Sequence, residues 1–476
     1  AGATSGTVQF AGGISDAVLS YASSSGSIVA GFNTAKTDDT DVAVTVTNAA
    51  TVAQANTIAG ATSGTVQFAG GISDAVLSYA SSGGTIVTAF NTAKTDDDDV
   101  AVTVTGTATV AQAGTISDAT SGTVDFSNAG ITDAIANLMN AGNNGVHADL
   151  QKAINKDNDI AVASNNAATV AQVNFIDAAT SYTGVITASV GDTAANLKDL
   201  TTANTDQITA TVDAGSVDAA HLLSIDSKTG ISVAANAVTT ITGTLSDINA
   251  VIAADGATTI TVDTDFDVTI SDTSITATAL TTMSGFTTGT ITTQAGTITG
   301  TDTAIIASIN DSGITTANNV IYDLDNSDTS LVSELTTIDN ATIGNIIAAN
   351  ITDSHSAITA LANNSSQVLE NATGTVTAEG TFAGETISMV DVADKHALVI
   401  EGKGGADTII GSASDDTIDG GTGNDLIKAG SGNDIVVISD IETGGLDKLL
   451  SFTSNGDAAS VNAGRDKIQF STSDLQ

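Results

Sequence analysis

The sequence contains no cysteine, no proline and no tryptophan among its 476 residues. The absence of cysteine excludes disulfide bridges and thiolate metal sites, so stability must come from packing, hydrogen bonds or metal ions held by oxygen. Only 3% of the residues are aromatic, although 41% are hydrophobic. The core must therefore be built from Ala, Val, Ile and Leu, which suits thin, regularly layered repeat structures better than a thick globular core.

Basic residues are also few, because 12 Lys and Arg stand against 54 Asp and Glu and leave a formal net charge of −42. This charge repels nucleic acid and anionic membrane surfaces, so we expect neither as a partner. Divalent cations would relieve the self-repulsion; the alternative is that acidity only keeps a secreted protein soluble. No apolar run approaches the ~18–20 residues that a membrane span needs. Because the chain starts at Ala1 without a signal peptide, we expect a processed chain or a fragment.

Internal repeats dominate the first part of the chain. Residues 1–58 and 59–116 are near-copies, and the marker Thr-Ser-Gly at Thr4 recurs at equal spacing at Thr62 and Thr120. A looser copy starts at Thr180, roughly one more period along the chain. A second marker, Thr-Val-Ala-Gln, recurs with similar spacing at Thr51, Thr109 and Thr169. Such self-similarity indicates a serial array of one structural unit.

Each repeat is predicted to contain two halves, each a strand followed by a helix. Thr7–Phe10 and Asp41–Val46 alternate as strands do, and Ile14–Leu19 is predicted to begin a helix, with clearer periodicity in Ile131–Leu138. A short apolar segment follows at Val52–Ala55. Later helix starts are predicted at Gly191–Leu197, Gly243–Ile248 and Gly300–Ile305, and the clearest later strand at Ile260–Ile270.

The predicted fold class is mainly β with short helices, as a repetitive, solenoid-like, β-rich array followed by a C-terminal parallel β-roll. The alternative is a string of separate small β-sandwich domains. We expect three parts: three tandem repeats of about 58–60 residues over 1–179, diverged Thr-, Ala- and Asp-rich repeats over 180–390, and the roll with its cap over 391–476.

From Gly402 the composition changes to glycine and aspartate in four nine-residue segments, GKGGADTII, GSASDDTID, GGTGNDLIK and AGSGNDIVV. The aspartates of these segments lie at the same position in each, at Asp407, Asp416, Asp425 and Asp434. Two positions after each aspartate stands an apolar residue: Ile409, Ile418, Ile427 and Val436. A Gly-Asn-Asp-rich linker is the alternative, but a linker has no reason to keep the apolar residue in phase.

The spacing has a physical explanation. Glycines let the backbone turn tightly with its carbonyl oxygens inward, and the apolar residue points from a short strand into a thin core. One segment makes a turn and a strand, so two segments complete a coil of about 18 residues. Stacking the coils places Asp407 near Asp425 and Asp416 near Asp434. Stacked carboxylates and carbonyls favour Ca²⁺, which takes about six or more oxygen ligands, over Zn²⁺ or Mg²⁺.

Residues 402–437 resemble the RTX (hemolysin-type) calcium-binding repeats of proteins that bacteria export by type I secretion. The segment Ile438–Phe470, which ends in Gly464-Arg465-Asp466-Lys467-Ile468-Gln469-Phe470, resembles the cap of many such rolls. This resemblance covers only the C-terminal part of the chain, from Gly402 onward. The Thr-, Ala-, Val- and Asp-rich array before it is similar in texture to the repeats of cyanobacterial surface-layer and surface-fibril proteins that carry RTX tails.

The resemblance implies that carbonyls at the first and third positions and the aspartate of each segment hold Ca²⁺. The implied ligands form four sets: Gly402, Gly404 and Asp407; Gly411, Ala413 and Asp416; Gly420, Thr422 and Asp425; Ala429, Ser431 and Asp434. Ser412 and Ser414 depart from the glycine pattern and put the second site in doubt. The family also implies secretion in an unfolded form and folding outside the cell as Ca²⁺ binds, a coupling that is physically reasonable.

Acidic clusters recur at the junction between the helix and the alternating strand of the N-terminal repeats. Adjacent aspartates repel one another unless they are solvated or bound to metal. A second set of calcium ligands is therefore a candidate, with a solvated loop as the alternative. The candidate residues are Asp38, Asp39 and Asp41; Asp96, Asp97 and Asp99; Asp157 and Asp159.

Residues that could support catalysis are scarce. The four histidines are scattered, and neither the HExxH motif of metalloproteases nor the GxSxG motif of lipases occurs. The sequence therefore predicts no enzyme, with a secreted hydrolase as the least favoured alternative. Near-identical units expose near-identical surfaces, which can self-associate head to tail.

We expect a secreted, extracellular, calcium-dependent structural protein that assembles with itself into a filament or surface layer on the cell surface. Cell-surface polysaccharide is a further candidate partner. The leading alternative is an RTX adhesin in which the repeats serve as spacers.

Overall fold

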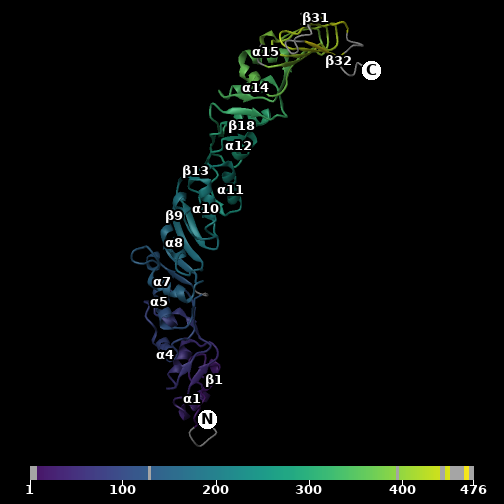
Figure 1. Cartoon of the computed structure of the whole chain (residues 1–476). Helices are drawn as coiled ribbons and strands as arrows, with labels where there is room; N and C mark the ends of the chain where they lie inside the picture. Colours follow the sequence, from purple (N-terminus) through teal and green to yellow (C-terminus); the bar gives the residue numbers. More distant parts are fainter. Residues whose placement is uncertain (1–7, 127–129, 393–395, 440–444, 451–465, 471–476) are drawn as a thin grey trace, which may run out of the picture. The chain divides into compact units, whose positions relative to one another are not determined.

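The computed structural model describes residues 8–126, 130–392, 396–439, 445–450 and 466–470. By internal packing the chain divides into two units, each of which is considered by itself. Unit 1 comprises residues 1–239 and 247–263, and unit 2 comprises residues 240–246 and 264–476. Within each unit the coils follow one another in sequence order (Figure 1). Every pairing between the strands described in either unit is parallel, as in a solenoid.

The elements of unit 1 are short. Its strands are β1 (Ile14–Asp16), β2 (Val44–Val46), β3 (Val66–Gln67), β4 (Ile72–Ala75), β5 (Val102–Thr105), β6 (Val124–Asp125), β7 (Ile131–Asp133), β8 (Val162–Ala167), β9 (Ile186–Asp192), β10 (Gln207–Val212), β11 (Gly215–Asp218), β12 (Val233–Ala234) and β14 (Ile260–Thr261). Its helices are η1 (Val18–Ser20), α1 (Ala30–Asp38), α2 (Val52–Ala59), α3 (Val76–Tyr79), α4 (Thr88–Asp96), α5 (Val110–Ala119), α6 (Ile135–Leu138), α7 (Ala148–Lys156), α8 (Val170–Asp177), α9 (Ala194–Leu197) and α10 (Ala219–Asp226).

In unit 2 helices give way to strands toward the C-terminus. Its strands are β15 (Asp267–Ile270), β16 (Ser274–Thr276), β17 (Ile291–Thr293), β18 (Thr297–Gly300), β19 (Ile314–Thr315), β20 (Ile321–Leu324), β21 (Thr329–Ser330), β22 (Ile346–Ile347), β23 (Asn350–Ser354), β24 (Val376–Glu379), β25 (Thr386–Ser388), β26 (Leu398–Glu401), β27 (Thr408–Ile410), β28 (Thr417–Asp419), β29 (Leu426–Lys428), β30 (Ile435–Ile438), β31 (Lys448–Leu450) and β32 (Lys467–Phe470). Its helices are α12 (Ala277–Ser284), α13 (Asp302–Asn310), α14 (Val332–Asp339), α15 (His355–Asn364), α16 (Ser366–Glu370) and η2 (Val390–Val392). β13 (Val238–Gly243) and α11 (Leu245–Gly256) have residues in both units.

Each N-terminal repeat forms two coils, and the register between coils repeats with it. Ile14 pairs with Val44 and Val44 with Val66, so the ladder passes from the first repeat into the second. The second repeat has the same register one period later, with Ile72 opposite Val102. Helices stack as well, because α2 packs on α4 and α5 on α7. The structure therefore confirms the β-rich solenoid-like array, and the alternative of separate β-sandwiches is wrong.

The Thr-Val-Ala-Gln marker is a helix start that is also bonded to the preceding coil. In the second repeat, the Gln112 backbone N–H donates to Thr109 Oγ1 (3.3 Å), and the Thr109 N–H donates to Gln112 Oε1 (3.0 Å). This reciprocal pair is a capping box, which satisfies backbone donors at the start of α5. The Gln112 side-chain amide also donates to the Ser81 carbonyl (3.1 Å). The marker recurs because each repeat needs this start and this contact.

The Thr-Ser-Gly marker forms a turn that is hydrogen-bonded to the preceding coil. Thr62 Oγ1 donates to the Val42 carbonyl (2.7 Å) and accepts from the Gly64 N–H (3.0 Å). A Cβ on Gly64 would lie 2.0 Å from the Asp41 carbonyl oxygen, so only glycine fits. The same Thr-x-Gly turn, with the same threonine contact, recurs in unit 2 at Thr342, whose Oγ1 donates to the Val320 carbonyl (2.6 Å). Both units thus share one kind of coil.

Some of the predicted elements are wrong in detail. Ile14–Leu19 was predicted to begin a helix, but Ile14–Asp16 is strand β1 and only η1 follows, because β2 of the next coil bonds the backbone of Ile14–Asp16. Ile131–Leu138 divides in the same way into β7 and α6. Ile260–Ile270 is not one strand but β14 and β15.

Other predictions are confirmed or fall outside the described residues. Helix starts are present at α11 and α13, and Val52–Ala55 lies in α2. In the segment Gly191–Leu197, the first two residues end strand β9, and the short helix α9 begins at Ala194. Of the strand predicted at Thr7–Phe10, Thr7 lies outside the described residues, and Val8–Phe10 is not a strand. In the part of the chain that is described, no helix is both long and apolar enough to cross a membrane.

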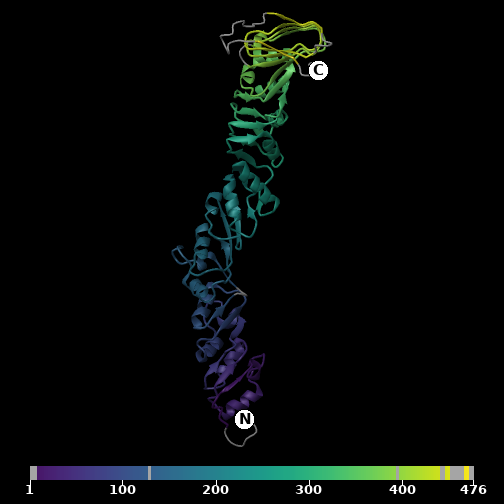
Figure 2. The same cartoon turned by 45° about the vertical axis from the view of Figure 1, so that its right-hand side comes forward.

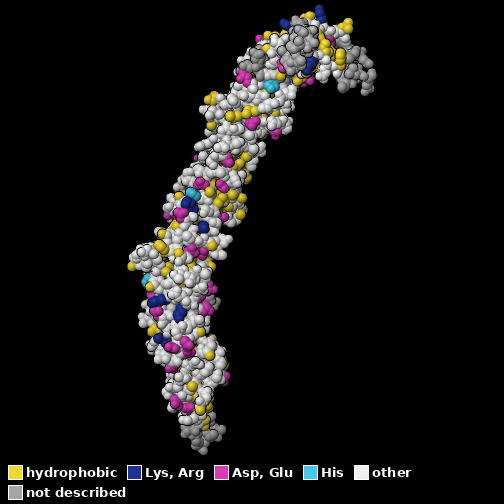
Figure 3. Space-filling model, in the orientation of Figure 1, with side chains coloured by type: hydrophobic (Ala, Val, Ile, Leu, Met, Phe, Trp, Pro, Cys, Tyr) yellow, Lys and Arg dark blue, Asp and Glu magenta, His cyan; other side chains and the backbone are white. Residues whose placement is uncertain are grey.

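The acidic junctions bond one coil to the next. The Phe10, Phe68 and Phe126 backbone N–H groups donate to Oδ2 of a junction aspartate about half a repeat later in the sequence. The acceptors are Asp39 (2.7 Å), Asp97 (2.6 Å) and Asp157 (2.5 Å). These carboxylates therefore hold adjacent coils of unit 1 together. Other acidic side chains are spread over its surface (Figure 3).

Burial makes two of these carboxyls weak acids. Burial, aided by the nearby Asp99 carboxylate and opposed by the Phe68 N–H, raises the pKa of Asp97 to about 6. Burial and the nearby Asp159 carboxylate raise the pKa of Asp157 to about 6 as well. At neutral pH each site holds two close negative charges, which costs stability.

We predict that Gln112→Ala destabilises unit 1 by ~1–3 kcal/mol, because it removes the capping box and a buried side-chain hydrogen bond together. Urea unfolding followed by circular dichroism measures the change. Gln172→Ala is the matched control, since Gln172 forms the same box at a more exposed position. An equal loss in both variants would contradict the inter-coil role of Gln112.

We also predict that unit 1 loses stability as the pH rises from about 4 to about 6. The folded-state pKa values of Asp97 and Asp157 lie above the value of 3.8 expected when unfolded, so protonation favours folding. In chelator, the melting temperature should be higher at pH 5 than at pH 7.5. Asp97→Asn with Asp157→Asn should reduce this difference, because asparagine keeps an acceptor oxygen without the charge. The exposed Asp265→Asn, which lies outside unit 1, is the control for charge alone, and an unchanged pH slope in the double variant would refute the prediction.

Candidate metal centre

The C-terminal part of unit 2 is a stack of coils with two rows of strands. Ile400 pairs with Ile418 and Ile418 with Val436 in one row, and Ile409 pairs with Ile427 in the other. Each partner lies two nine-residue segments further along the chain, and all of these side chains are buried. The structure thus confirms the predicted coil length and the inward apolar positions. Figure 2 shows the stacked rungs, coloured yellow-green to yellow.

Between the strands, glycine-rich turns lie directly on one another. Gly423 has φ +144°, and a Cβ on it would lie 1.5 Å from the Gly405 carbonyl oxygen. The Gly405 N–H donates to the Thr422 carbonyl (2.8 Å), and the Thr422 N–H donates to the Lys403 carbonyl (3.1 Å). Backbones can approach this closely only where no side chain intervenes, which explains the glycines of the nine-residue pattern.

The aspartates of the turns form two ladders, one on each side of the roll. On one side, the Glu385 N–H donates to Asp407 Oδ1 (2.8 Å) and the Asp407 N–H to Asp425 Oδ1 (2.8 Å). On the other side, the Leu398 N–H donates to Asp416 Oδ1 (2.9 Å) and the Asp416 N–H to Asp434 Oδ1 (2.9 Å). The predicted proximity of Asp407 to Asp425 and of Asp416 to Asp434 is therefore present.

The second carboxylate oxygen shows where a cation fits. Asp407 and Asp434 are 1% and 0% exposed, and Oδ2 of each is buried without a hydrogen-bond partner. Burial raises the pKa of Asp407, and it raises that of Asp434 to about 6. A buried charged oxygen without a partner is costly, and a bound cation removes that cost. These residues therefore fit a metal ion.

Peptide carbonyls approach the same positions. A Cβ on Gly402 would lie 3.0 Å from Asp407 Oδ2 and 2.3 Å from the Gly420 carbonyl oxygen, so a carboxylate and a carbonyl from adjacent turns converge beside this glycine. Within the described residues, no three His, Cys, Asp or Glu side chains form a metal-binding group. An ion here would take most of its ligands from carbonyls, which suits Ca²⁺ and not Zn²⁺.

Two further aspartates continue the ladders beyond the four predicted turns. The Asp425 N–H donates to Asp447 Oδ1 (3.0 Å), and the Asp434 N–H to Asp466 Oδ1 (3.3 Å). Sequence reasoning missed both as ladder members, although Gly-x-Asp-Lys-Leu/Ile repeats the tail of the nine-residue pattern in each. The ladder signal was hidden because the spacing grows to 22 and 32 residues.

The predicted cap is only partly described. β32 pairs with β30, with Ile468 opposite Val436, whereas residues 440–444 and 451–465 lie outside the described residues. The other predicted calcium ligands lie far from the roll in sequence, at the junctions of unit 1. There Asp38 and Asp96 end helices α1 and α4, and Asp39, Asp97 and Asp157 accept backbone hydrogen bonds. Their partners Asp41, Asp99 and Asp159 are exposed.

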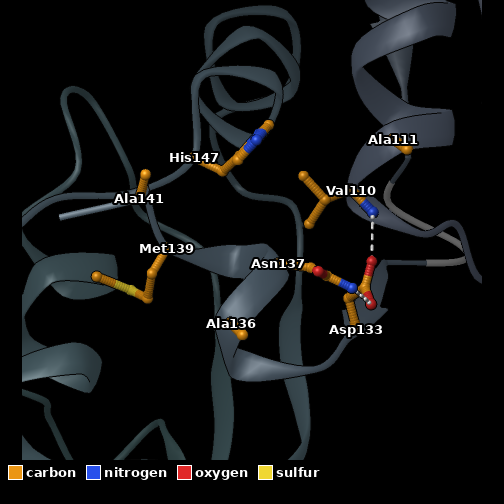
Figure 4. Close-up of a pocket in the computed structure, with 8 residues that line it drawn as sticks. All are labelled: Val110, Ala111, Asp133, Ala136, Asn137, Met139, Ala141 and His147. Carbon is orange, nitrogen blue, oxygen red and sulfur yellow. Dashed lines mark hydrogen bonds between the residues drawn. The ribbon is translucent and has the colours of Figure 1, made fainter. Parts of the chain in front are cut away.

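Unit 1 also carries a cleft of about 390 Å³ between α5 and the turn before α7 (Figure 4). Its carboxylate, Asp133, accepts hydrogen bonds from the Val110 N–H (3.1 Å) and the Asn137 side-chain amide (2.7 Å). His147 Nδ1 accepts from the Asp149 N–H (3.2 Å) and caps α7. The titratable groups that line the cleft are thus engaged in holding the backbone.

Comparison with known proteins agrees with the geometry of the roll. Residues 401–436 match the family model of the RTX calcium-binding nonapeptide repeat in four copies. No curated protein and no solved structure is significantly similar to the chain. The matched residues are those whose turns stack and whose aspartates form the ladders. Residues 401–436 therefore carry RTX nonapeptide repeats, and the ion that repeats of this family bind is Ca²⁺.

Proposed function

We propose that this chain is a secreted structural protein that folds with Ca²⁺ outside the cell and assembles with itself into a filament or surface layer. The observation that carries the calcium part is the pair of buried, unpartnered carboxylate oxygens at Asp407 and Asp434. Folding buries these charges, so the roll is favoured when a cation accompanies them. A low-calcium cytosol would leave the roll unfolded for export.

The proposed ligands follow the nine-residue pattern. In three of the four turns, the carbonyls of the first and third residues act with the aspartate. These sets are Gly402, Gly404 and Asp407; Gly420, Thr422 and Asp425; Ala429, Ser431 and Asp434. Oxygen ligands of this kind, from carbonyls and carboxylates together, are those that Ca²⁺ prefers.

Self-assembly is supported by the terminal strands. Within the described residues, β1 pairs only with β2, and β32 pairs only with β30. Among the residues that the structure describes, each therefore has one strand edge without a partner, and such edges are templates for pairing with another chain. On β32, Ile468 and Phe470 are 45% and 50% exposed. Because pairing throughout is parallel, a second copy could extend the ladder in the same sense. Ca²⁺ would then bridge acidic side chains on the surfaces of neighbouring copies; Figure 3 shows such side chains on one copy.

We predict that Asp407→Asn weakens calcium binding by ~10-fold or more, since a hydrogen bond or contact to a charged group contributes ~1.5–3 kcal/mol. Calorimetric titration of the whole chain measures the change, and circular dichroism in chelator should show loss of β-structure that Ca²⁺ restores. Asp265→Asn is the matched control, because it removes the same charge from an exposed position. If the chain takes up no Ca²⁺, or keeps its β-structure in chelator, the calcium part of the proposal fails.

Negative-stain electron microscopy tests the assembly. We expect regular fibres or sheets with Ca²⁺ and separate molecules in chelator. Ile468→Lys with Phe470→Lys should abolish the assemblies, because it places charge on the open edge. Phe382→Lys is the control, since Phe382 is 84% exposed but lies outside the strands. Separate molecules in both conditions would instead favour an adhesin in which the repeats are spacers.

A further inference from the structure

The turn of residues 411–416 differs from the other turns of the roll. The turn of residues 420–425 reads Gly-Gly-Thr-Gly-Asn-Asp, whereas the turn of residues 411–416 reads Gly-Ser-Ala-Ser-Asp-Asp. Ser412 and Ser414 thus stand where glycines stand in the complete pattern. The backbone still makes the turn, and Asp416 still joins its ladder through the Leu398 N–H.

Ser412 supplies hydrogen bonds to both oxygens of Asp416. Its backbone N–H donates to Asp416 Oδ2 (2.8 Å). Its hydroxyl oxygen lies 2.8 Å from the same Oδ2 and 3.0 Å from Oδ1. With the Leu398 N–H, both oxygens of this buried carboxylate have donors from the protein itself. These hydrogen bonds lower the cost of burying the charge, so Asp416 depends less on a cation than a carboxylate with an unpartnered oxygen does.

The Ser412 side chain is held in place for this contact. The Ser414 N–H donates to Ser412 Oγ (3.1 Å), so the hydroxyl directs its own hydrogen toward Asp416. Ser412 is buried, and its carbonyl accepts the Ser431 N–H of the next coil (3.2 Å). The backbone at residue 414 therefore orients the Ser412 hydroxyl, and this hydroxyl bonds the carboxylate.

Asp407 and Asp434 show the contrast. Each has one oxygen on the ladder, with donors Glu385 N–H and Asp416 N–H, and Oδ2 of each is buried without a partner. Calcium binding at these aspartates supplies a missing partner. At Asp416 it would have to displace the Ser412 donors from Oδ2, which makes binding less favourable there.

We propose that the turn of residues 411–416 holds no Ca²⁺, because Ser412 takes the place of the ion at Asp416. The roll then has turns of two kinds. In one kind Ca²⁺ binds the aspartate carboxylate, and in the other kind Ser412 donates hydrogen bonds to it. This inference rests on the calcium role proposed above and narrows it to particular turns. The Asp416 turn can form before calcium arrives, and it joins β26 to β28 through the Leu398 contact.

The number of Ca²⁺ ions bound per chain tests this inference in full-length protein. By calorimetric titration and flame analysis, Asp416→Asn should bind as many ions as the wild type, whereas Asp407→Asn should bind fewer. Ser412→Gly with Ser414→Gly restores the glycine pattern and should bind one ion more than the wild type. Circular dichroism in Ca²⁺ confirms that each variant is folded, and the glycine variant keeps the test decisive if Asp416→Asn does not fold.

Two results would overturn the inference: loss of an ion in Asp416→Asn, or no additional ion in the glycine variant. Either result can occur while Asp407→Asn still binds fewer ions than the wild type. In that case the calcium role of the roll is retained, and the proposal that Ser412 replaces the ion at Asp416 is wrong. A wild-type chain that takes up no Ca²⁺ would overturn both proposals together.

Discussion

Short parallel strands leave backbone N–H groups at their ends without a partner in their own coil, and the next coil must satisfy them. In both units the acceptor is a side chain from that next coil, as with Asp97 at Phe68 and Asp425 at Asp407. Because an unpaired buried peptide group is costly, this contact fixes the register of each coil on its neighbour. It also requires many carboxylates near the backbone, so much of the acidity of the chain follows from its architecture.

The two regions handle the resulting buried charge differently. In unit 1 the carboxyl groups remain near solvent or beside a second aspartate, and protonation relieves them, as the raised pKa values of Asp97 and Asp157 show. In the roll, by contrast, Oδ2 of Asp407 and Oδ2 of Asp434 are buried without a hydrogen-bond partner. We propose that calcium fills that need at Asp407 and Asp434, whereas Ser412 donates to the carboxylate of Asp416. An aspartate that accepts a backbone N–H from the adjacent coil is thus used both where a metal is proposed and where none is.

Sequence reasoning recovered what is periodic along the chain. The nine-residue spacing predicted a coil of two segments, and the register of Ile409 with Ile427 confirms it. Prediction from the sequence failed where a residue bonds a partner that is distant in the sequence. Ile14–Asp16 has helical features locally, but β2 of the next coil bonds its backbone. Likewise, the role of Asp39 depends on Phe10, 29 residues earlier, and no local pattern reveals that bond. Asp447 and Asp466 kept the local pattern but not the nine-residue period, so neither was predicted as a member of the ladders.

The shared register of the first two repeats has an evolutionary consequence. Ile14 pairs with Val44 in the same register in which Ile72 pairs with Val102 one repeat later. The surface that one repeat offers to the next coil is therefore the same in both repeats. Duplication or deletion of one whole repeat therefore leaves every junction as it was. Evolution can therefore lengthen or shorten the protein by whole repeats without changing the contacts between adjacent coils.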